Sequence, residues 1–195
     1  LRKSMHIDHL PSHFTRIGVV ADTHIPDRLK KLPPSVFEKL RGVDVILHAG
    51  DLSAAHVVKD LETIAPVLTV QGNRDIITRY GWTLPTDRLI EIGEVRIGLT
   101  HGHGGVKGYI AEKLRYHTLG YNVERTVDRV QSRFKDVEAV VFGHTHRPYN
   151  KMCNGVLIFN PGSVGPDYYT RYGAGVGIIT INNSAVRGEI IPLTD

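Results

Sequence analysis

Residues 140–148 join a short apolar run to a glycine and a pair of histidines, in the order Gly143-His144-Thr145-His146. Valines followed by a glycine predict a buried strand that stops at a tight loop. Because His144 and His146 are two positions apart, both side chains leave an extended segment on the same side. Such a pair suits two neighbouring metal positions, but a surface loop with two solvated histidines explains it better unless further ligands are found.

Four other apolar, strand-like segments also end in side chains with nitrogen or oxygen donors. Residues 17–21, 43–49, 67–70 and 95–100 are followed by Asp22-Thr23-His24, Gly50-Asp51, Gly72-Asn73-Arg74-Asp75 and His101-Gly102-His103. Each one alone has an ordinary explanation, such as an aspartate that starts an Asx-turn. Five coincidences are a poor explanation, because ligands of open α/β sheets bind outside the carboxyl ends of the strands. The pattern predicts a metal centre.

Helical periodicity separates these strands. We expect one helix to begin at Pro33-Pro34-Ser35, a second to run from its cap at Ser53 to about residue 64, and two more to span 108–118 and 122–135. In the last of these, Arg125, Arg129 and Arg133 fall on one face. A basic face can meet phosphate or a partner, but a solvated helix face is the commoner explanation and the one we expect.

Other residues have structural interpretations. His48 lies inside an apolar run and is interpreted as a hydrogen-bonded core histidine, and Trp82 is expected to pack against the body within a loop-like stretch, 76–90. Residues 156–159, 175–181 and 186–191 are rich in β-branched side chains, and the last two segments are predicted to form a hairpin. These C-terminal strands predict a second sheet.

Length and composition set the class of protein. With 195 residues, 41% of them hydrophobic, the chain is long enough for one globular domain, expected over 16–195 after a disordered leader at 1–15. The single Cys153 excludes an internal disulfide and indicates a reducing compartment such as the cytoplasm. The net charge of +4 permits a nucleic-acid partner without requiring one. No apolar run approaches the roughly 20 residues of a transmembrane helix, so no membrane association is expected.

The five motifs, in this order, resemble those of the calcineurin-like metallophosphoesterases over roughly residues 17–165. The short length and the turn Asn160-Pro161-Gly162-Ser163 are similar to the small, single-domain prokaryotic phosphodiesterases, the YfcE-like group. The resemblance implies an α/β fold, a four-layer α/β/β/α sandwich of two mixed β-sheets flanked by helices. It also implies phosphodiester hydrolysis, with a small molecule as the expected substrate and a homo-oligomer as one possible assembly.

The resemblance further implies a set of ligands for two divalent metal ions. One metal would be held by Asp22, His24, Asp51 and His146, and the second by Asp51, Asn73, His101 and His144. Nitrogen and oxygen donors without thiolate suit Mn, Fe, Ni, Co or Zn, and we expect Mn. Two such ions can clamp a phosphoryl group and activate a bridging water as hydroxide. Either His101 or His103 can in principle be the ligand; the resemblance favours His101 and leaves His103 near the substrate.

One position departs from the family pattern. Related enzymes commonly have histidine after the motif asparagine, where it stabilises the transition state or protonates the leaving group, and the next aspartate orients it. This chain has Arg74 before Asp75. Arginine stays charged and cannot act as a general acid, but its fork can hold a phosphate oxygen. We expect weak protonation of the leaving group, or its transfer to His103 or water; a simple ion pair between Arg74 and Asp75 is the structural alternative.

Two other functions are compatible with the same residues. A catalytically silent interaction scaffold, like the retromer subunit of this family, would share the fold, but such scaffolds lose metal ligands whereas this chain has all seven. A nuclease fits the basic isoelectric point of about 9.2, although no nucleic-acid-binding motif is found. An enzyme is therefore the preferred prediction.

Overall fold

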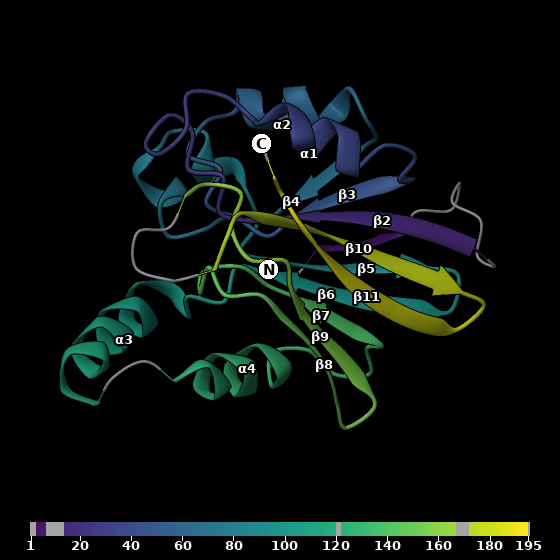
Figure 1. Ribbon diagram of the computed structural model, residues 1–195. Coiled ribbons are helices and arrows are strands. Elements are labelled where there is room, and N and C mark those ends of the chain that lie inside the picture. The colour runs from purple at the N-terminus through teal and green to yellow at the C-terminus, as the bar shows by residue number, and fades with distance from the viewer. Residues whose placement is uncertain (1–2, 7–13, 120–121, 167–171, 195) are drawn as a thin grey trace.

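The chain forms two β-sheets that pack face to face, with helices on either side of the pair (Figure 1). The structure is a computed structural model and describes residues 3–6, 14–119, 122–166 and 172–194. On one side lie α1 (Pro34–Lys39) and α2 (His56–Glu62), and on the other lie α3 (Gly105–Leu119) and α4 (Val123–Gln131). The predicted four-layer α/β/β/α sandwich is confirmed.

The first sheet has five strands in the order β11-β10-β2-β3-β4. Its members are β2 (Phe14–Val20), β3 (Val45–His48), β4 (Val67–Thr69), β10 (Gly175–Asn182) and β11 (Ala185–Pro192). The strands β2, β3 and β4 are parallel, with helices as the crossovers, so their carboxyl ends lie at one edge. The expected hairpin is present as the antiparallel pair of β10 and β11. The prediction that the C-terminal strands together form a second sheet is wrong, because β10 pairs with β2 and so places the hairpin in the first sheet, while residues 156–159 lie in the other.

The second sheet has six strands in the order β1-β5-β6-β7-β9-β8. Its members are β1 (Lys3–His6), β5 (Asp87–Ile92), β6 (Val95–Thr100), β7 (Ala139–Val141), β8 (Tyr149–Cys153) and β9 (Val156–Asn160). Here β6, β7 and β9 are parallel to one another. β8 is antiparallel to β9, and β5 is antiparallel to β6 but parallel to β1.

Three local predictions differ from the structure. Residues 3–6 of the expected leader form β1, which pairs in parallel with β5, and Phe14 and Thr15 already belong to β2; the rest of the leader lies outside the described residues. The stretch 76–90 contains two short 3-10 turns and the start of β5. Ser53 does not cap α2, because its backbone has a φ of +67° and its N–H is donated to Asp75, while the helix begins at His56.

The core between the two sheets is continuous and apolar. Side chains such as Ile17 and Leu47 of the first sheet pack with Ile97 and Val141 of the second, and all four are essentially inaccessible to solvent. Phe159 of β9 crosses this layer; a Cβ placed on Gly177 or Gly188 of the opposite sheet would come within 2.5 Å of its ring. The two glycines therefore leave space for the Phe159 ring, which fixes the position of one sheet against the other.

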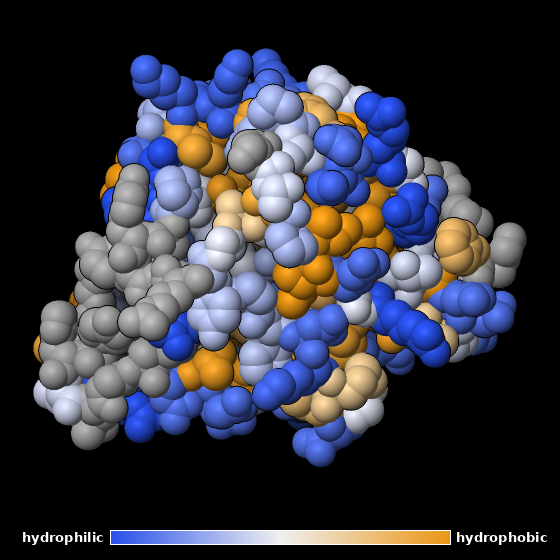
Figure 2. Space-filling view, in the orientation of Figure 1, coloured by the Kyte–Doolittle hydropathy of each residue, from blue (hydrophilic) through white to orange (hydrophobic). Residues whose placement is uncertain are grey.

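Separate apolar clusters attach the helices to the outer faces of the sheets. Leu61 of α2 and Val36 of α1 pack on the first sheet, and Val127 and Val130 of α4 pack on the second. The strand β11 lies at the edge of its sheet, and its residues are exposed or only partly buried. Figure 2 shows an apolar strip over this strand, with hydrophilic side chains around it. Among the described helices, none combines the length and the apolar character that crossing a membrane requires.

Candidate metal centre

The candidate site lies where the carboxyl ends of strands from both sheets meet. The loops after β2, β3 and β4 come from the first sheet, and the loops after β6 and β7 come from the second. Backbone hydrogen bonds tie these loops together: Asp22 N–H donates to the Gly50 carbonyl at 3.1 Å, and Gly143 N–H donates to the His101 carbonyl at 3.2 Å. The pattern of the sequence predicts that all five strands end at one edge of a single open sheet. In the structure three of them end at the edge of the first sheet and two at the adjoining edge of the second.

Five of the seven predicted ligands have a left-handed backbone. The φ angles are +53° at Asp22, +50° at His24, +57° at Asp51, +68° at His144 and +55° at His146. This conformation costs an L-residue roughly 1–2 kcal/mol, although aspartate and histidine adopt it more readily than most residues. Such conformations persist only where surrounding structure enforces them, and they cluster at functional sites.

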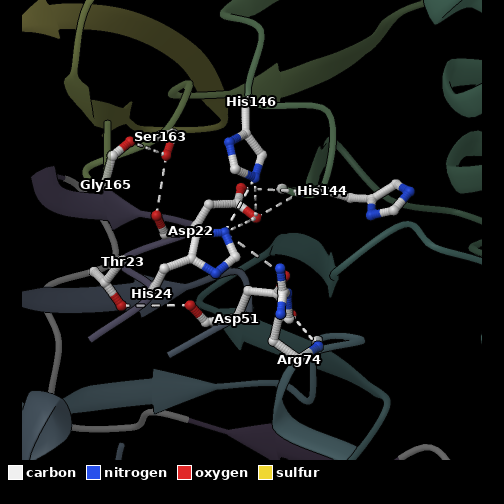
Figure 3. A network of polar contacts seen from close by, with 12 residues as sticks. Asp22, Thr23, His24, Asp51, Arg74, His144, His146, Ser163 and Gly165 are labelled. Atoms are coloured by element: carbon white, nitrogen blue, oxygen red, sulfur yellow. Dashed lines mark hydrogen bonds and ion pairs between the residues drawn. The ribbon is translucent and has the colours of Figure 1, made fainter. Parts of the chain in front are cut away.

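One group of donors consists of Asp22, His24 and His146 (Figure 3). Nε2 of His24 lies 3.1 Å from Nε2 of His146, and Oδ1 of Asp22 lies 3.3 Å from Nε2 of His146. Asp22 is fully buried, and its carboxylate accepts the backbone N–H of His144 at 3.0 Å. Two imidazole nitrogens and a carboxylate oxygen thus face one small volume.

A second group adjoins the first and consists of Asp51, Asn73, His101 and His144. Oδ1 of Asn73 is 3.0 Å from Nε2 of His101 and 3.0 Å from Nδ1 of His144. Oδ1 of Asp51 is 3.5 Å from the same nitrogen of His101, and its Oδ2 is 3.8 Å from Nε2 of His24. The Asp51 carboxylate therefore has a neighbour in each group.

A backbone carbonyl that follows a strand of the first sheet orients the candidate ligand His101. Its Nδ1 lies 2.7 Å from the carbonyl oxygen of Ala49, which can accept a hydrogen bond but cannot donate one. The proton must then sit on Nδ1, which leaves the lone pair of Nε2 directed at Asn73 and Asp51. A backbone acceptor that fixes the tautomer in this way is typical of metal-binding histidines.

The electrostatics of the two groups fit divalent cations. Burial and the neighbouring charge of Asp22 raise the pKa of Asp51 to about 8, while burial lowers the pKa of His24 to about 3. Burial also acts to raise the pKa of Asp22, but three nearby histidines outweigh it and the net shift is downward. The two buried carboxyl groups and the neighbouring imidazoles are held close together, and they form a set of donors that a cation would satisfy.

The side chains of Arg74 and Asp75 do not form an ion pair with each other. The buried Asp75 carboxylate accepts backbone N–H groups from Asp51, Ser53 and Gly72 at 2.8–2.9 Å, so it holds two ligand loops together. The Arg74 N–H donates to Oδ1 of Asp51 at 2.7 Å, and its side chain is exposed. Among the described residues no ion pair joins Arg74 to Asp75, so the structural alternative for Arg74 is wrong.

His103 lies beside the second group of donors. Its ring centroid is 5.4 Å from that of His101 and 6.2 Å from that of His144. The side chain is 6% exposed. Burial, and after it the nearby histidines and arginines, lowers the pKa of His103 to about 3. It is placed next to the donors without being among the groups that the geometry brings together as ligands.

Two other predictions have clear outcomes. His48 is a buried, hydrogen-bonded core residue, as predicted: its Nε2 lies 3.3 Å from Oγ1 of Thr23, and its Nδ1 accepts the Gly50 N–H. Trp82 is not packed against the body, because 74% of it is exposed. It lies within the 3-10 turn Gly81–Thr83, and its indole N–H donates to the carbonyl of Ile76.

Sequence reasoning did not identify several residues that support the ligands. Asn160 is fully buried and donates to the Gly143 carbonyl and to Thr145 Oγ1, at 2.8 and 3.1 Å, which fixes the loop between His144 and His146. Arg28 Nη1 lies 3.2 Å from Nδ1 of His146. Ser163 Oγ donates to the carbonyl of Asp22 at 3.0 Å. The Asn160-Pro161-Gly162-Ser163 turn was the available signal for two of these three residues, Asn160 and Ser163.

Comparisons with known proteins agree with this arrangement. Residues 15–184 match the model of the calcineurin-like phosphoesterase superfamily domain. A probable metallophosphoesterase of Methanothermobacter thermautotrophicus is 38% identical over 175 residues, which cover 90% of this chain and 91% of that protein. A phosphodiesterase of Methanocaldococcus jannaschii is 23% identical over 160 residues, covering 75% and 82% of the two chains.

Solved structures show the same architecture. A Vps29 from Entamoeba histolytica, in complex with Zn²⁺, superposes with a TM-score of 0.65 at 23% identity and covers 89% of this chain and 97% of its own. This likeness concerns the fold, whereas the domain match spans most of the sequence, including all seven candidate ligands. The chain therefore belongs to the calcineurin-like phosphoesterase superfamily.

Proposed function

We propose that the protein is a dinuclear, metal-dependent phosphodiesterase that acts on small phosphodiesters. The observation that carries the proposal is the convergence of seven nitrogen and oxygen donors into two adjoining groups, with Asp51 next to members of both. Asp22, His24, Asp51 and His146 would hold one cation, and Asp51, Asn73, His101 and His144 the other. Manganese is the metal we expect, since the donors are hard or borderline and include no thiolate.

When bound, two divalent cations would neutralise phosphate oxygens and lower the pKa of water enough to supply a hydroxide nucleophile. The residues of the chain then have distinct tasks. Asp75 keeps the loops of Asp51 and Asn73 at a fixed separation through its three backbone acceptor contacts. Arg74, exposed beside Asp51, would hold a non-bridging phosphate oxygen, and His103 would face the substrate from the side of the second donor group.

The test combines elemental analysis with a panel of model esters. Purified protein is expected to contain divalent metal and to hydrolyse bis(p-nitrophenyl) phosphate, a diester, faster than p-nitrophenyl phosphate, a monoester. Chelation should abolish turnover, and Mn²⁺ should restore it. Asp51→Asn removes the charge shared by both donor groups and should lower the rate at least 100-fold together with the metal content, whereas the exposed Asp128→Asn on α4 should change neither.

A protein-interaction scaffold is the alternative function, because Vps29 shares the fold. The complete set of donors supports the enzyme, but that Vps29 also binds Zn²⁺, so the assay of activity distinguishes the two functions. Metal-free protein that stays inactive after every divalent cation has been supplied would favour the scaffold. Salt-dependent binding of DNA or RNA would instead favour a nuclease.

A further inference from the structure

A small cavity opens beside the candidate metal centre, between the loop that precedes α3 and the side of α4. It measures about 50 Å³ and is lined by Thr86, Thr100, Gly102, His103, Gly104, Gly105, Arg129, Val130 and Arg133. Among these described residues none is acidic, while two are arginines. Arg133 already forms an ion pair, because its Nε and Nη2 both donate to the Asp87 carboxylate at 2.6 Å. Arg129 is the other basic residue of this wall, and its Nη2 donates to Thr126 Oγ1 at 3.2 Å.

The loop on the other wall is shaped for a close approach of its backbone to a ligand. Gly102, Gly104 and Gly105 have φ angles of +97°, +73° and +71°, a region that side chains disfavour. Gly105 is also the first residue of α3, a helix of 15 residues with no acidic residue in its first turn. The first N–H groups of a helix lack intrahelical partners and carry the positive end of its dipole, which favours anions.

His103 provides an independent indication that the cavity accepts a polar ligand. It is 94% buried, since its exposed fraction is 6%, and its Nδ1 has no hydrogen-bond partner among the described residues. A buried polar nitrogen without a partner is costly and is usually satisfied by a ligand or water. The Arg129 side chain packs over the same loop, because a Cβ on Gly104 would come within 3.1 Å of its Cδ.

We propose that this cavity is a subsite for a second phosphoryl group of the substrate, bound by the α3 N-terminus, His103 and Arg129. The proposal rests on the proposed phosphodiesterase function and specifies its substrates. By the same measure of volume, one water needs about 10–15 Å³, so 50 Å³ holds a phosphoryl group but not a nucleobase. The His103 ring lies 5.4 Å from the His101 ring, which puts the second group a few bonds from the scissile one.

The first experiment uses metal-free protein, so that it does not depend on catalysis. Inorganic phosphate is titrated into ¹⁵N-labelled protein, and the amide resonances of Gly102, Gly104 and Gly105 are followed. We expect these resonances to shift saturably in the wild type. Arg125→Gln, at an exposed position of α4, should bind phosphate like the wild type, whereas Arg129→Gln on the same helix should bind it about tenfold more weakly. Unshifted glycine amides in the wild type, or equal titrations in both variants, would overturn the subsite.

The second experiment distinguishes a substrate subsite from a site for free phosphate. The p-nitrophenyl ester of thymidine 5′-phosphate is compared with the same ester carrying a 3′-phosphate, in the presence of metal. Arg129→Gln should reduce the preference for the 3′-phosphorylated ester, measured as the ratio of kcat/KM values, by about tenfold, and Arg125→Gln should leave the ratio unchanged. Phosphate binding at the loop with an unaltered preference would refute a role in substrate recognition. If neither ester is hydrolysed while the glycine amides still titrate, the proposed function fails and the anion site stands.

Discussion

The backbone at individual ligands shows that the site is held in place by its surroundings. Asp22, His24 and Asp51 are left-handed residues. Segments distant in sequence bind the carbonyl groups of two of them: His24 N–H donates to the Asp51 carbonyl, and Gly165 N–H donates to that of Asp22. Because each such conformation costs of the order of 1 kcal/mol, the loops must be fixed by contacts that outweigh it. The donors are consequently held in place by contacts of the chain itself.

The presence of arginine at position 74 should determine how strongly the rate of hydrolysis depends on the pKa of the leaving alcohol. An arginine cannot donate a proton to the departing oxygen, so rates should fall steeply from aryl to alkyl phosphodiesters as the pKa of the leaving alcohol rises. Arg74→His should flatten this dependence and raise turnover of alkyl esters relative to aryl esters. The measurement is a series of kcat/KM values plotted against leaving-group pKa. A flat plot for the wild type would show that another group supplies the proton.

Between the strands, a single buried asparagine connects the second sheet to the histidine loop. Asn160 at the end of β9 donates to the Gly143 carbonyl and accepts the Gly162 N–H at 2.9 Å. Asn160→Ala leaves these backbone groups without partners and should lower the free energy of unfolding by about 1–3 kcal/mol. Urea unfolding of metal-free protein measures the change, and isothermal titration with Mn²⁺ should show weaker binding. The exposed Ser184→Ala is the control, and equal stabilities would contradict the assigned role of Asn160.

The contact between β5 and the segment after α4 should make stability depend on pH. Burial raises the pKa of Asp87, but hydrogen bonds and the charge of Arg133 outweigh it, so the folded-state pKa lies below the usual 3.8. A carboxyl group with a depressed pKa stabilises the fold above its unfolded pKa and loses that contribution as the pH falls through the folded value. The stability difference between wild type and Asp87→Asn should therefore be constant above about pH 5 and shrink below about pH 4.

Chemical unfolding of metal-free protein between pH 3 and pH 7 measures that difference. Using the variant as the reference removes the contributions of the other carboxylates, which titrate in the same range. Asp128→Asn, exposed on α4, should run parallel to the wild type at every pH. A difference between wild type and Asp87→Asn that does not vary with pH would mean that the contact with Arg133 contributes nothing.

Local pattern predicts an element when its own residues decide its conformation. The strands before Asp22, Asp51 and His101 are short apolar runs ended by donors, and they were predictable together with the ligands. The strand β5 was not, because it begins inside a stretch with proline and tryptophan and is stabilised by pairing with β1 and β6. Ser53 has the composition of a helix cap, yet a contact with Asp75, 22 positions away, decides its backbone.

Over the whole molecule, the local pattern predicted a second sheet but not which strands belong to it, and the four-layer arrangement could be stated only through the family resemblance. Strands β2 and β6 have similar apolar patterns, but they belong to different sheets, and hydropathy does not record which strand pairs with which. The exposure of Trp82 depends likewise on where its loop falls relative to the body. The supporting roles of Arg28 and Asn160 follow from contacts more than 15 positions apart in sequence, which no local motif specifies.

Each candidate metal position takes donors from both sheets, so bound cations should join the two halves of the sandwich. Asp22 and His24 follow β2 in the first sheet while His146 follows β7 in the second, and Asn73 and His101 are divided in the same way. A ligand that binds only the folded state stabilises it by about 2.7 kcal/mol at 100 times its dissociation constant. For a domain of this size, that corresponds to a rise in Tm of about 5–10 °C.

Chelation should therefore lower the Tm by about 5–10 °C, and Mn²⁺ should restore it. Hydrogen exchange locates the effect: amides at residues 22–24 and 143–146 should exchange faster without metal, while amides within β2 and β7 should change little, because the apolar layer between the sheets persists. Asp51→Asn, which lacks the charge shared by the two groups, should respond less to added Mn²⁺. An unchanged Tm on chelation of metal-loaded protein would show that the cations do not connect the sheets.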